Sequence, residues 1–124
     1  MRGATAALLA LGVLFGSATD GEARSADDPP VLEGEAAQAL RCAAYIGMAA
    51  QHGLNAGLLS AQDRLVMATW SMQVLERWVP LAPEQRLATY GEMIEKLDDP
   101  LEVDRLVGRH GAWCLQTFDP ERPA

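Results

Sequence analysis

Two histidines, His52 and His110, are the side chains of this sequence that titrate near neutral pH, so they are the first candidates for chemistry. His110 stands in an apolar run of helical spacing that ends at Phe118, which favours a core histidine whose ring bonds a carbonyl or a carboxylate. A metal site shared with His52 would need two further ligands from other segments. We therefore expect no metal. The alternative is a small-ligand or metal carrier that uses a cavity near His110.

Two cysteines, Cys42 and Cys114, are the next candidates. They are far apart, whereas a redox pair or a c-type haem site has its cysteines close together and a zinc site has four ligands. An even number of cysteines in an exported chain predicts a disulfide instead. The bridge would close a loop of about 70 residues, for which chain entropy predicts roughly 4 kcal/mol of stabilisation.

Serines and acids offer no catalytic pattern. Ser60 has the position of a helix cap, Ser71 falls inside an expected helix, and neither has the G-x-S-x-G setting of a hydrolase nucleophile. The sequence has no glycine-rich phosphate loop, and its acids fall on the polar faces of the expected helices. We therefore expect no catalytic residues, no cofactor and no enzymatic activity.

The N-terminal segment 1–23 has the pattern of a secretory signal peptide. Arg2 precedes an apolar block at 4–15, and small residues follow up to Ala18. Cleavage is expected after Ala18 or after Ala23. The apolar block has about a dozen residues, whereas a membrane-spanning helix needs roughly 20. The sequence thus predicts export to the periplasm or the extracellular space, without stable membrane insertion after cleavage.

The chain is acidic, with a formal net charge of −7. Segment 1–23 carries −1 of this, which leaves −6 from Arg24 onward. Such a domain repels nucleic acid and anionic lipid surfaces, and the sequence has no run of five or more basic residues. We expect no nucleic-acid partner.

The rest of the sequence predicts an all-α fold. A flexible leader at 24–32 and a disordered tail at 119–124 flank a bundle domain at 33–118. Gly53 is expected to cap the first helix, which begins near Glu33. The other helices are expected at 60–79, 83–97 and 100–118, begun by Ser60 with Asp63, by Pro83 and by Asp99 with Pro100. In a small up-down four-helix bundle the first and last helices are neighbours, so one disulfide would tie them.

Segment 60–79 is apolar over more than half of its helical circumference, which predicts the central helix of the bundle. One apolar line from Leu65 to Val79 is expected in the core. Trp70 and Trp78 lie on a second line, where they either fill the core or form a surface that binds a partner. The first helix has small residues at three- and four-residue steps, which predicts close packing on this face: Ala36, Ala39, Ala43, Gly47 and Ala50.

The run from Cys42 to Gly47, with Tyr45 between them, resembles the cysteine-tyrosine-glycine start of small exported helical immunity proteins of the type VI secretion Rap/Tai kind. The resemblance covers residues 42–47, and the glycine is displaced by one position. It implies an immunity-type protein that binds a toxin partner. From the residues alone, we expect a non-catalytic protein-interaction or structural domain of the bacterial cell envelope.

Overall fold

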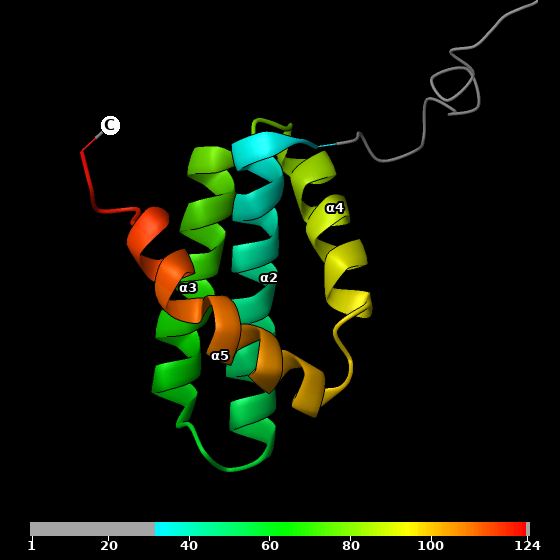
Figure 1. The fold of residues 1–124 in the computed structure, drawn as a ribbon, viewed down its shortest axis with the longest axis vertical. Coiled ribbons are helices and arrows are strands. Elements are labelled where there is room, and N and C mark those ends of the chain that lie inside the picture. Colours follow the sequence, from blue (N-terminus) through cyan, green and yellow to red (C-terminus); the bar gives the residue numbers. More distant parts are fainter. Residues whose placement is uncertain (1–31, 124) are drawn as a thin grey trace, which may run out of the picture.

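A computed structural model describes residues 32–123 of the chain. This part consists of four helices, namely α2 (Gly34–Asn55), α3 (Ala61–Trp78), α4 (Pro83–Glu95) and α5 (Pro100–Thr117). They follow one another alternately down and up, and α5 crosses α2 obliquely (Figure 1). The predicted all-α up-down four-helix bundle is confirmed. The predicted signal peptide and segment 24–31 of the predicted leader lie outside the described residues.

The central helix of the bundle is α2, which packs against each of the other three helices. The prediction that segment 60–79 is central is therefore wrong. The reason is size: Ala39, Ala43, Ala44 and Ala50 are fully buried on α2, and side chains this small allow three helices to approach one backbone. Three residues of the predicted small-residue face, Ala39, Ala43 and Ala50, are thus packed in the core.

Helix α3 packs mainly on α2, so its broad apolar arc is only partly covered. Its buried residues are Ser71, Val74 and Leu75. Leu75 belongs to the first predicted apolar line, Val74 belongs to the second, and Ser71 lies between the two. Val79 is buried just after the helix ends. Leu65, which was predicted to be in the core, is 54% exposed. The core on this helix is confined to its C-terminal half.

The predicted starts of the last three helices are confirmed. The Asp63 amide donates to the Ser60 side-chain oxygen at 3.0 Å, and the Ser60 amide donates to the Asp63 carboxylate at 3.4 Å, which completes a capping box. Pro83 begins α4. The Asp99 carboxylate accepts from the Leu101 amide at 3.0 Å at the start of α5.

Gly53 does not cap the first helix as predicted, because α2 continues to Asn55. The left-handed residue is Gly57, with a φ of 76°, and its amide donates to the Leu54 carbonyl at 3.0 Å. Gly53 has a different role. A Cβ atom at Gly53 would lie 2.7 Å from Cδ1 of Leu59, so the glycine allows the following loop to fold back onto α2.

The main core lies where α2, α3 and the end of α5 meet, and Phe118 is its largest fully buried side chain. The segment predicted as a tail begins with contacts to α3: Arg77 Nη1 donates to the carbonyls of Asp119 at 3.3 Å and Pro120 at 2.9 Å. Among residues 32–123, no helix combines the length and the hydropathy needed to cross a membrane.

Candidate functional site

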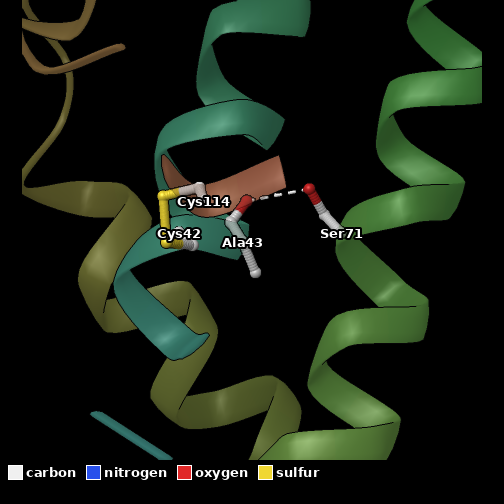
Figure 2. Close-up of a disulfide and its surroundings, with 4 residues drawn as sticks. All are labelled: Cys42, Ala43, Ser71 and Cys114. Carbon is white, nitrogen blue, oxygen red and sulfur yellow. Dashed lines mark hydrogen bonds between the residues drawn. A yellow bond between two sulfur atoms is a disulfide. The ribbon is translucent and has the colours of Figure 1, made fainter. Parts of the chain in front are cut away.

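The predicted disulfide is confirmed. Cys42 of α2 and Cys114 of α5 are bonded, with their Cα atoms 5.5 Å apart and their positions 72 apart in the sequence (Figure 2). Both cysteines are buried. The bond holds the last helix against the central one.

A hollow of about 270 Å³ lies beside this disulfide. Gln38, Arg41 and Tyr45 line it from α2, His110 and Trp113 line it from α5, and the two cysteines complete the lining. We call this feature the α2/α5 hollow. Its α2 residues are three and four positions apart, so they share one face of that helix. The predicted cavity near His110 corresponds to this hollow, while its use by a ligand stays a prediction.

Aromatic rings give the hollow defined walls. The rings of Tyr45 and His110 stack with centroids 6.1 Å apart and planes 26° apart. Trp113 packs edge-on against the fully buried Phe118, with centroids 5.7 Å apart. Trp113 is nevertheless 45% exposed. Trp113 is therefore an exposed aromatic side chain that is held in place by its contact with the core.

His110 lacks the carbonyl or carboxylate partner that was predicted for it. It is half-buried, its ring contacts Tyr45, and its nitrogens bond to none of the described residues. A carbonyl partner is found for His52, whose Nε2 lies 3.2 Å from the Leu97 oxygen. Over residues 32–123, no three side chains of the metal-binding types come together.

Arg41 gives the hollow a positive charge that no acid of the described chain neutralises. The ion pair found within residues 32–123 joins Glu102 and Arg105, at 3.1 Å on the exposed side of α5. Arg77 and Arg86 donate to backbone carbonyls instead. Arg41 is exposed and bonds to none of the described residues. The α2/α5 hollow thus combines aromatic walls with a guanidinium group on an acidic protein.

Trp70 and Trp78, which were predicted to fill the core or to form a partner surface, are half-buried and pack against the main core. Trp78 meets Phe118 edge-on with centroids 5.2 Å apart, and the Arg77 guanidinium lies 4.7 Å from the centre of its ring. The more exposed tryptophan is Trp113, which the sequence analysis did not single out. Its position about 100° around the helix from Cys114 places it at the edge of the buried stripe, and this was the available signal.

A polar cluster lies in the core, on a different side of α2 from the hollow. The Ser71 hydroxyl donates to the Ala43 carbonyl at 2.8 Å (Figure 2), and the Tyr90 hydroxyl contacts Ser71 above Gly47. The Ser71 proton is therefore used in a helix-to-helix bond. This cluster joins α2, α3 and α4 and is structural.

Tyr90 makes the stability of the bundle sensitive to pH in the alkaline range. Burial raises the pKa of its phenol above the ordinary 10.0. The folded state therefore holds this proton more tightly than the unfolded chain. Its contribution is fully present below pH 10.0 and is lost as the pH rises through the raised value.

We expect the melting temperature to fall as the pH is raised past 10.0, and to fall less steeply in a Tyr90→Phe variant. Thermal unfolding followed by circular dichroism on both sides of this pH measures the difference. Parallel curves for the two proteins would show that Tyr90 does not carry the effect.

Searches of protein-family models, of curated proteins and of solved structures find no match to this chain.

Proposed function

We propose that this protein is an exported, non-catalytic domain of the bacterial cell envelope that acts by binding another protein at the α2/α5 hollow. The observation that carries the proposal is the exposed Trp113 in one hollow with Arg41, which no acid of residues 32–123 pairs. Tryptophan, tyrosine and arginine are the residues most enriched at the energetic centres of protein interfaces. The hollow brings together one of each: Arg41, Tyr45 and Trp113.

Rigidity of the hollow supports the same proposal. Trp113 rests on Phe118, and the disulfide fixes α5 on α2 directly beneath the lining side chains. A binding surface ordered before the partner arrives loses less conformational entropy on association. The free protein would therefore present the hollow in its binding conformation.

The volume of the hollow is large enough for a partner side chain and lies close to the lower end of the range for small-molecule pockets. Pockets for drug-sized molecules range over roughly 300–1,000 Å³, and this one has about 270 Å³. A small-ligand carrier that uses the same hollow near His110 is the second candidate. A metal carrier has less support, since residues 32–123 offer no group of three ligand side chains.

Export is supported by the signal-peptide pattern at 1–23 and by the disulfide, because such bonds persist in oxidising compartments. An immunity-type protein that binds a toxin partner is an alternative within this proposal.

Changing Trp113 to alanine is expected to weaken partner binding at least about 30-fold, since truncating a residue at the energetic centre of an interface costs about 2 kcal/mol or more. The measurement uses the processed chain as bait in a periplasmic extract, followed by titration of the captured protein against each variant.

Leu115→Ala is the matched control for this variant. Leu115 lies on the same helix, two residues further on and hence on a different face, and it is 50% exposed against 45% for Trp113. The Leu115→Ala protein should keep the partner with unchanged affinity. Equal affinity of the Trp113→Ala protein for the partner would exclude the α2/α5 hollow as the binding surface.

A further inference from the structure

We propose that the occupant of the α2/α5 hollow is an acidic peptide segment of the partner, in which a carboxylate side chain stands next to an apolar or aromatic one. This inference rests on the proposed function and adds the chemistry of the partner to it. The carboxylate binds the Arg41 guanidinium, and the neighbouring side chain packs between Trp113 and the stacked Tyr45–His110 pair.

The carboxylate is inferred from Arg41, whose guanidinium has no acid partner among residues 32–123. A guanidinium offers a planar fork of donors that matches a carboxylate in two parallel bonds, and such charge-assisted bonds are about twice as strong as neutral ones. No acid of residues 32–123 satisfies this fork, although the whole chain has an excess of acids. A carboxylate of a partner would supply the complementary group.

Arg41 is the only formally charged side chain among the residues that line the hollow. Arg109, one helical turn before Trp113 on α5, is exposed and is not among the lining residues. The charge of the lining is therefore opposite in sign to the net charge of −7.

The net charge also limits how acidic the segment is. Acids elsewhere on the protein repel a strongly negative partner at long range, and at physiological salt this repulsion fades beyond about 8 Å. One or two carboxylates close to Arg41 gain the local attraction without this cost. The apolar neighbour then supplies the remaining affinity by covering the exposed part of Trp113.

Selection from a phage-displayed library of random peptides on the processed wild-type protein tests the proposal. The selected peptides should share an aspartate or glutamate next to an apolar or aromatic residue. The best peptide, made synthetically, should bind an Arg41→Gln variant about 10-fold more weakly or worse, and should bind less tightly as salt is raised. Lys96→Gln removes one exposed cation elsewhere and should leave the affinity unchanged.

A charge reversal adds an independent readout. Selection on an Arg41→Glu variant should yield peptides with lysine or arginine in place of the acid. The proposal is overturned if no peptide is selected, if the selected peptides lack acids, or if Arg41→Gln binds them as well as the wild type does. Binding of benzoate as tight as that of the best peptide would overturn the peptide assignment in favour of a small carboxylate.

Failure of the acidic-peptide proposal can be told apart from failure of the proposed function. If Trp113→Ala loses the natural partner while the selected peptides lack acids, the hollow is a protein-binding surface and only the acidic chemistry is wrong.

Discussion

Replacing both Cys42 and Cys114 by alanine is expected to lower the free energy of unfolding by about 4 kcal/mol, because the bridge joins residues 72 positions apart and restricts the unfolded chain accordingly. Domains of this size have roughly 5–15 kcal/mol in total. For 60 to 100 residues, each kcal/mol shifts the melting temperature by about 4–8 °C. The expected fall is therefore roughly 20 °C, measured by thermal unfolding of the oxidised wild type and the double variant.

The architecture makes this large effect reasonable. Helix α5 packs chiefly on α2, so the disulfide is a main tie between the last helix and the rest of the bundle. The wild type with its disulfide reduced is the matched control, because it keeps both sulfur atoms in the core and avoids the cavity that alanine leaves. A shift of only a few degrees in both proteins would mean that helix packing alone holds α5 in place.

Local chemistry explains why so much of the fold could be predicted from the sequence. The starts of α3, α4 and α5 depend on residues within one turn of the helix end, namely Ser60, Pro83 and Asp99, and each acts as its type predicts. The disulfide also followed from count and compartment alone. These features need no knowledge of how the helices are arranged in space.

The arrangement of the helices needed more than the apolar pattern. Segment 60–79 has the broadest apolar arc, yet α2 is central because small residues, not large ones, decide how many helices can approach one axis. For the same reason Leu65 has no helix to cover it. Amphipathicity predicts which face is buried, and it does not predict how many neighbours bury it.

The candidate site was predictable in its position and not in its composition. His110 indicated where a hollow would lie, and for Trp70 and Trp78 the sequence left the core and a partner surface as alternatives. Whether a tryptophan at the edge of a stripe is covered depends on the crossing angle of two helices. Helix α5 crosses α2 obliquely (Figure 1), and Trp113 remains exposed at that crossing.

Changing Gly47 to leucine is expected to destabilise the bundle by about 3 kcal/mol, at the upper end of the cost of overfilling a packed core. A Cβ atom at this position would overlap the Tyr90 hydroxyl, whereas the Ser71 oxygen would lie at an ordinary contact distance of 3.5 Å. The glycine therefore allows α4 to place Tyr90 directly on the backbone of α2. Thermal unfolding should show a fall of roughly 12 °C or more.

A smaller substitution identifies the clash itself. Gly47→Ala should destabilise the protein despite the better helix propensity of alanine, and adding Tyr90→Phe should restore stability, because the next ring atom, Cζ, would lie at an ordinary 3.5 Å from the new Cβ. Gly108→Ala, on α5 with open space around it, should instead stabilise by about 1 kcal/mol. If Gly47→Ala also stabilised the protein, the close approach of α4 to α2 at this point would be wrong, and with it the small-residue face that makes α2 central.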